Sequence, residues 1–214
     1  MALLRSGIAR RWRPASVWML YVAGLLPAAW GFYLGATGNL GADPVKTFEH
    51  HLGLWALRFI VLTLAVSPLR DLGGPNLIRY RRALGLLSFY YVLMHFAVYL
   101  VLDQALVPSA VLADIVKRPF ITLGMAALLL LVPLALTSNS FSIKRLGRNW
   151  SRLHRLVYVI AGLAGLHFAL STKVLAAEHY FYLGLLAVLI AYRIVRRLQP
   201  RRGRRRAMQP VATE

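Results

Sequence analysis

The chain has 214 residues, of which 58% are hydrophobic and only 15% are charged, so its composition is that of a polytopic membrane protein and not of a soluble domain. A formal net charge of +19 would suit a nucleic-acid-binding protein only if the basic residues shared one soluble face, but here they lie between apolar runs. We therefore expect membrane lipid around the chain and no nucleic-acid partner. Cysteine is absent, which excludes disulfides, thiolate metal sites and covalent attachment of a c-type haem.

Six apolar runs of spanning length follow one another along the chain. The first, residues 17–36, follows a basic segment that resembles the start of a signal peptide, but it has the length of a membrane span and no small-residue cleavage site follows it. Pro27 is expected to kink this helix, and the spacing of Gly31 and Gly35 suits the close approach of a neighbouring helix. The other predicted spans are 52–69, 83–102, 120–137, 150–168 and 180–194, with a short interfacial helix in the loop before Arg118.

The basic residues divide unequally between the two sides of these spans. The N-terminal segment, the 70–82 loop, the 138–152 loop and the tail from Arg193 hold four, four, four and eight Lys or Arg residues. The three other connections hold only Lys46, Lys117, Arg118 and Lys173, against five acids. The positive-inside rule then places both termini in the cytoplasm, which agrees with an even number of spans.

These observations predict an all-α protein, a six-transmembrane-helix bundle with both termini cytoplasmic. Its parts are a basic cytoplasmic N-terminus (1–16), the membrane domain (17–195) and a basic, disordered cytoplasmic tail (196–214).

Two histidines are expected at nearly the same depth. The third span rises from the cytoplasmic edge, so His95 lies about 18 Å along it, and His167 lies about 21 Å along the fifth span, which runs the same way. An ionisable side chain at this depth is usually functional, and neutral histidine is a common haem-iron ligand. We predict that His95 and His167 are the axial ligands of a b-type haem between two helices. The alternative is that each is a core histidine bonded to a carbonyl or hydroxyl oxygen.

His154 lies at the cytoplasmic end of the fifth span. At the same depth, the third span has Arg81 and Arg82. Arginine stays protonated and does not ligate iron, so a second haem lacks an evident second ligand. The three residues are candidates for a second cofactor site, in which a quinone or flavin contacts His154 and the arginines bind a phosphate or propionate. The alternative for His154 is an interfacial side chain bonded to water.

The thirteen residues between His154 and His167 correspond to about 140° around an ideal helix, so the two do not share a face. Either a bend or π-bulge intervenes, for which Gly162 and Gly165 are candidates, or only one of the two histidines faces a haem.

Four further polar residues lie near the periplasmic side. Arg58 is two turns inside the second span, where an unpaired cation is costly, and it either extends to the periplasmic surface or pairs with a haem propionate. His50, His51 and His179 lie at periplasmic helix ends, where we expect wet interfacial side chains and not ligands.

Four segments in order complete the sequence evidence: HLGLWALRFIVLTLAVSPLR, RYRRALGLLSFYYVLMHF, KRPFITLG and RLGRNWSRLHRLVYVIAGLAGLHF. Over residues 17–195 the chain resembles the family of haem-binding membrane subunits of bacterial periplasmic methionine sulfoxide reductase systems. That family is part of the wider group of ferric-reductase-like transmembrane domains, which includes the NADPH oxidases and STEAP reductases. In two-haem members the third-helix ligands are fourteen positions apart, and from His95 this spacing leads to Arg81, where the chain departs from the pattern.

The resemblance implies an electron-transfer subunit in the bacterial inner membrane, non-catalytic by itself. Electrons would come from the quinone pool or a cytosolic flavin reductase, pass through one or two haems b and an optional FMN, and reach a periplasmic molybdenum-containing subunit that reduces methionine sulfoxide in oxidised proteins. The chain has no Gly-rich nucleotide-binding motif, so the reductant comes from elsewhere. The alternatives are a cytochrome b anchor of another respiratory or ferric reductase, and a haem-free transporter or assembly protein whose histidines relay protons.

Overall fold

The computed structural model describes residues 13–199, and every regular element in that range is a helix. The long helices are α2 (Arg13–Ala36), α3 (Pro44–Asp71), α4 (Arg81–Val98), α6 (Pro119–Leu136), α9 (Val157–Leu170) and α10 (Ala177–Leu198). The short elements are η1 (Ile78–Tyr80), the π-helical turn η2 (Tyr99–Asp103), α5 (Pro108–Lys117), α7 (Ser140–Leu146), α8 (Arg148–Leu153) and the 3-10 turn η3 (His154–Leu156). Most of the predicted basic N-terminus and disordered tail lie outside the described residues.

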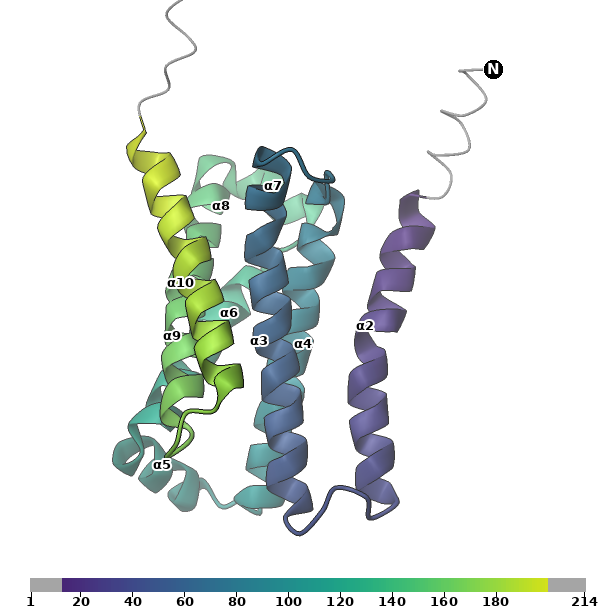
Figure 1. Ribbon diagram of the computed structural model, residues 1–214, viewed down its shortest axis with the longest axis vertical. Coiled ribbons are helices and arrows are strands. Elements are labelled where there is room, and N and C mark those ends of the chain that lie inside the picture. The colour runs from purple at the N-terminus through teal and green to yellow at the C-terminus, as the bar shows by residue number, and fades with distance from the viewer. Residues whose placement is uncertain (1–12, 200–214) are drawn as a thin grey trace, which may run out of the picture.

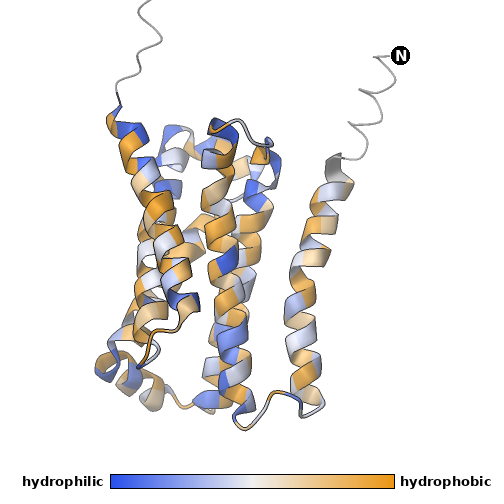
Figure 2. Ribbon diagram, in the orientation of Figure 1, coloured by the Kyte–Doolittle hydropathy of each residue, from blue (hydrophilic) through white to orange (hydrophobic). Residues whose placement is uncertain are grey.

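The long helices lie side by side in one bundle, with α5 at one end and α7 at the other (Figure 1). We call these ends the α5 end and the α7 end. Five helical segments in the described range are long and apolar enough to cross a membrane: Ala15–Ala36, Pro44–Asp71, Ile78–Asp103, Pro119–Leu136 and Arg148–Leu170. They correspond to the first five predicted spans, and the sixth predicted span corresponds to α10, which packs against α9 and α3. Apolar residues dominate the middle of the bundle, and hydrophilic residues gather towards its ends (Figure 2).

Helix α3 lies at the centre of the packing. It contacts α2 and α4 on one side and α9 and α10 on the other. One buried cluster joins α3 to α6, α9 and α10 and includes Leu57, Leu131 and Ile160. The other joins α3 to α2 and α4 and includes Leu87 and Tyr91, both with no exposed surface. Because lipid tails are as apolar as these side chains, close packing and polar contacts hold such helices together more than the hydrophobic effect does.

Tyr91 of α4 inserts its hydroxyl group into the backbone of α2. The hydroxyl donates to the carbonyl oxygen of Gly24 at 2.8 Å and accepts from the amide of Ala28 at 3.0 Å. These two backbone groups would bond to each other in a regular α-helix, and they lie beside Pro27, which has no amide hydrogen. A side chain inserted at a proline is a known cause of helix bending, which agrees with the kink predicted at Pro27.

The irregular turn in the fifth span is not where the sequence analysis placed it. The 3-10 turn η3 begins at His154 itself, and α9 is regular from Val157 to Leu170. Gly162 has open space where a side chain would be, and Gly165 packs closely on Leu186 of α10. Gly165 thus serves helix packing, Gly162 has no evident structural role, and the irregularity between His154 and His167 is the tighter 3-10 turn that begins at His154.

Candidate cofactor site

The structure brings together the two histidines that the sequence places at one depth. His95 on α4 and His167 on α9 have ring centres 6.0 Å apart, and the ring planes make an angle of 81°. Both rings line a cavity of about 260 Å³ between α3, α4, α6 and α9, which we call the histidine cavity. Their meeting depends on the fixed rise of two helices that run the same way.

Each of these imidazoles is held by a backbone carbonyl group on a neighbouring helix. Nδ1 of His95 lies 2.9 Å from the carbonyl oxygen of Glu49 on α3, and Nδ1 of His167 lies 2.7 Å from that of Phe120 on α6. A carbonyl oxygen only accepts, so Nδ1 carries the hydrogen and donates in both rings. The neutral tautomer that results leaves Nε2 with a free lone pair, which is the arrangement found in metal-ligating histidines.

The lining of the histidine cavity is mostly apolar, with polar groups towards the α5 end. The polar lining residues there are Lys46, Glu49, His50, Asp103, Arg118 and Ser171. The carboxylate of Glu49 comes within 3.9 Å of Nε2 of His95. An apolar pocket with a few convergent polar groups is typical of a cofactor site.

The donor set fits a haem iron. Two imidazoles that bind one metal ion through Nε2, with bonds of about 2 Å and roughly 1 Å from nitrogen to ring centre, would have ring centres about 6 Å apart. The observed separation of His95 and His167 is 6.0 Å. The residues that the structure describes contain no cluster of three or more His, Cys, Asp or Glu that could hold a bare metal ion. A pair of histidines suits an iron whose remaining ligands are supplied by a porphyrin.

A second, larger cavity of about 1070 Å³ lies towards the α7 end, and we call it the arginine cavity. Seven arginines are among the residues that line it: Arg70, Arg81, Arg82, Arg155, Arg193, Arg196 and Arg197. Asp71 is the one acid among the described lining residues, and it already accepts from Arg70 at 2.6 Å and Arg196 at 3.1 Å. The cavity wall therefore carries a large excess of positive charge, which favours an anionic ligand.

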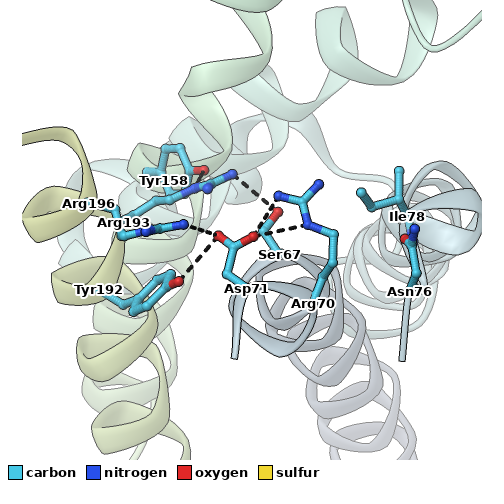
Figure 3. A network of polar contacts seen from close by, with 9 residues as sticks. All are labelled: Ser67, Arg70, Asp71, Asn76, Ile78, Tyr158, Tyr192, Arg193 and Arg196. Atoms are coloured by element: carbon cyan, nitrogen blue, oxygen red, sulfur yellow. Dashed lines mark hydrogen bonds and ion pairs between the residues drawn. The ribbon is translucent and has the colours of Figure 1, made fainter. Parts of the chain in front are cut away.

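Asp71 also ties two helices together at this wall (Figure 3). Its carboxylate, at the end of α3, accepts from Arg196 and from the hydroxyl of Tyr192 at 3.3 Å, both on α10. Beside it, Arg193 of α10 donates to the hydroxyl groups of Ser67 on α3 and Tyr158 on α9. We call this network the Asp71 clasp.

The three residues predicted to form a second site, His154, Arg81 and Arg82, all line the arginine cavity. The hydroxyl group of Thr137 donates to the Pro133 carbonyl oxygen at 2.6 Å, so it accepts from Nε2 of His154 at 3.1 Å. The ring of His154 also stacks on Trp150, with centres 4.0 Å apart. Its Nε2 is therefore a donor with a protein partner, whereas Nε2 of His95 and of His167 is free to ligate.

Arg58 lines neither cavity. Its Nε donates to the hydroxyl of Tyr182 at 2.8 Å, and its Nη2 lies 3.4 Å from the carboxylate of Glu178, both on α10. Its guanidinium group also lies over the ring of Trp55, 4.7 Å from the centre. The structure thus gives Arg58 a protein carboxylate as its partner, and it links α3 to α10.

Two of the outer histidines have specific partners as well. Nε2 of His51 bonds to the carbonyl oxygen of Pro27 at 2.9 Å, so the predicted wet side chain is instead an anchor for α2. His179 accepts from the amide of Ala176 at the start of α10 and stacks on Phe168, with ring centres 4.3 Å apart. The prediction of freely hydrated side chains was wrong for these two.

The residues that hold the ligand candidates were not predicted from the sequence. Glu49 and Phe120 act through backbone carbonyl groups, which any residue type carries, so the sequence holds no direct signal for them. Gly53 and Gly124, which face the two histidine rings, were the available signal, because each is an isolated glycine inside a helix pattern, and such a glycine often has a packing reason.

Comparisons with known proteins identify the class of the chain. Residues 52–165 match the family described as "Ferric reductase like transmembrane component". The chain is thus a multi-pass membrane protein of the ferric-reductase-like class.

Closer relatives narrow the class. The chain is 59% identical over 205 residues to the protein-methionine-sulfoxide reductase heme-binding subunit MsrQ of Rhizobium meliloti. The aligned residues make up 96% of this chain and 94% of the relative. It is also 59% identical over 197 residues to MsrQ of Brucella anthropi (91% and 90%) and 62% identical over 180 residues to MsrQ of Brucella ovis (84% and 82%). The chain belongs to the MsrQ family. No solved structure gives a significant match to it.

Proposed function

We propose that this protein is the haem b-binding electron-transfer subunit of a methionine sulfoxide reductase system in a bacterial inner membrane. The observation that carries the proposal is the pair of imidazoles 6.0 Å apart, each with its Nδ1 bonded to a backbone carbonyl. Membership of the MsrQ family, whose relatives are named heme-binding subunits, supports the same function.

In this proposal each residue has a defined task. His95 and His167 would bind the haem iron through Nε2, and the carbonyl groups of Glu49 and Phe120 hold the rings in the tautomer that this requires. The apolar lining of the histidine cavity excludes water and contributes to the redox potential. The haem would supply the one-electron redox chemistry.

The charge distribution supports an orientation in which the α7 end faces the cytoplasm. The loops and helix ends at the α7 end carry most of the basic residues, as the positive-inside rule requires of a cytoplasmic face. With α10 as a sixth span, both termini are cytoplasmic. The histidine cavity then opens towards the periplasm and the arginine cavity towards the cytoplasm.

This orientation suggests a direction for the electrons. They arrive at the arginine cavity, from the quinone pool or a cytosolic flavin reductase, and leave at the α5 end to a periplasmic molybdenum-containing subunit that reduces methionine sulfoxide. Arg81 and Arg82 would bind the phosphate of FMN or the propionates of a second haem, with His154 at the wall of the site, and the other arginines of the cavity add positive charge. Arginine forms bidentate bonds to both kinds of anion.

The test is a reduced-minus-oxidised absorption spectrum with haem quantification on the purified protein. We expect the paired bands of a b-type cytochrome in the wild type and in His179→Ala, whose ring lies outside the histidine cavity. We expect His95→Ala and His167→Ala each to lose the haem of this site. Full low-spin haem in both variants would show that the ligand assignment is wrong. A wild-type protein without haem would favour a transporter or assembly function instead.

A further inference from the structure

The backbone sites that hold the imidazoles of His95 and His167 have the same arrangement on two different helices. The carbonyl group that holds His95 belongs to Glu49, and a glycine, Gly53, follows four residues later on α3. The carbonyl group that holds His167 belongs to Phe120, and Gly124 follows four residues later on α6. Each glycine faces the ring that its own helix holds.

The spacing of four residues has a structural reason. In an α-helix the carbonyl of residue i already accepts from the amide of residue i+4, so a second donor must approach past the side chain of residue i+4. A glycine at i+4 leaves that approach open. The carbonyl oxygen can then accept a second hydrogen bond from the imidazole.

The contacts show how little space remains at these positions. A Cβ atom on Gly124 would lie 2.9 Å from Nδ1 and 3.0 Å from Cε1 of His167, closer than such contacts occur in proteins. A Cβ atom on Gly53 would lie 3.2 Å from both Nδ1 and Cε1 of His95. By contrast, Gly162 on α9 and Gly184 on α10 have no atom within 4 Å of such a position. The imidazoles therefore lie directly against the backbone of their neighbouring helices.

Two constraints on each ring fix the direction of its plane. The hydrogen bond fixes the position of Nδ1, and the glycine backbone limits rotation of the ring about the line towards the ligand site. The result is an angle of 81° between the two planes. Perpendicular imidazoles interact with different d orbitals of a ferric iron and leave those orbitals nearly equal in energy, whereas parallel imidazoles separate them.

We propose that Gly53 and Gly124 are positioning residues that hold the two axial imidazoles nearly perpendicular. This inference rests on the proposed function. A ferric low-spin centre with perpendicular imidazoles gives a strongly anisotropic electron paramagnetic resonance (EPR) spectrum with one prominent low-field feature. Parallel planes give a rhombic spectrum with three resolved features.

The test is EPR spectroscopy of the oxidised, purified protein, with haem content measured on each sample. The signal that His167→Ala removes is assigned to the histidine cavity. We expect it to be strongly anisotropic in the wild type and unchanged in the control variants Gly162→Ala and Gly184→Ala. We expect Gly124→Ala to convert more than half of it to a rhombic signal, and Gly53→Ala to shift it by a smaller amount, because the added methyl group is less crowded there.

The possible failures are distinguishable. A wild-type protein without haem overturns the proposed function. A wild-type protein with haem and a rhombic signal overturns the perpendicular arrangement. Anisotropic signals that stay unchanged in both Gly53→Ala and Gly124→Ala overturn the role of the glycines. If Gly124→Ala does not retain haem, the shift in Gly53→Ala decides the question.

Discussion

The two cavities of this bundle treat histidine in opposite ways. In the histidine cavity, of about 260 Å³, both imidazoles donate from Nδ1 to a carbonyl and leave Nε2 free. In the arginine cavity, of about 1070 Å³, His154 donates from Nε2 to Thr137 and shares the cavity wall with seven arginines. In the proposed function the first cavity would coordinate a metal and the second would attract an anion.

The difference shows that the neighbours of a histidine define its role better than its depth in a membrane does. His154 and His167 belong to one segment of the chain, and both are partly buried. A carbonyl oxygen beside Nδ1 makes His167 a ligand candidate, whereas a hydroxyl oxygen beside Nε2 makes His154 a hydrogen-bond donor.

The largest expected effect is a loss of FMN affinity when positive charge is removed from the arginine cavity. We expect the double variant Arg81→Glu and Arg82→Glu to weaken the binding of FMN at least tenfold, about 1.4 kcal/mol, because two attractive charges become repulsive. Lys144→Glu is the control, since Lys144 lies on α7 but does not line the cavity. Equilibrium dialysis against FMN measures the effect. Equal affinities in the three proteins would show that the cavity does not bind the phosphate.

A smaller effect is expected from His154→Ala. The haem of the histidine cavity stays in place, because the ligand pair is untouched, but its reduction from the cytoplasmic side slows roughly threefold to tenfold. Thr137→Val removes the bonding partner of His154 and should slow reduction less, because the ring still stacks on Trp150. Stopped-flow absorption with a flavin reductase as donor provides the rates. Complete haem loss in His154→Ala would contradict the division between the two cavities.

The smallest effect concerns the Asp71 clasp, which lies at the solvent-facing wall of the arginine cavity. Asp71→Asn weakens the bonds to Arg70 and Arg196, so we expect a small decrease of the melting temperature in detergent and an unchanged haem spectrum. A double-mutant cycle with Arg196→Gln separates the direct pair from the remaining contacts. An altered spectrum of the haem in the histidine cavity would show that the two cavities are mechanically coupled.

Much of the arrangement follows from the sequence because helical rise is regular. The equal depth of His95 and His167 can be predicted from span boundaries and a fixed rise per residue, because an error of one residue in a boundary changes the predicted depth by only about 1.5 Å. The boundaries themselves were less accurate. The second span was predicted to begin at Leu52, whereas α3 begins at Pro44, because the polar first turns extend beyond the apolar run.

Long-range polar partners could not be predicted from the sequence. A cation inside an apolar span requires a partner, but nothing near Arg58 indicates that it is Glu178, 120 residues away. The turn at His154 could not be predicted from the sequence either. Gly162 and Gly165 are residues that favour a bend, whereas the 3-10 turn at His154 contains no glycine to indicate it. In both cases the outcome depends on contacts between helices and not on local preference.

The hydroxyl group of Tyr91 that bridges Gly24 and Ala28 has a consequence for how the chain is built into the membrane. Helix α2 is synthesised well before α4, so until Tyr91 arrives the amide of Ala28 and the carbonyl group of Gly24 can pair only with each other, as in a regular helix. An unpaired amide or carbonyl group in lipid costs several kcal/mol, so this internally bonded form is the one expected at insertion. The form bridged by Tyr91 is reached only when the third span packs against the first, and insertion and final hydrogen bonding are therefore separate events in biogenesis.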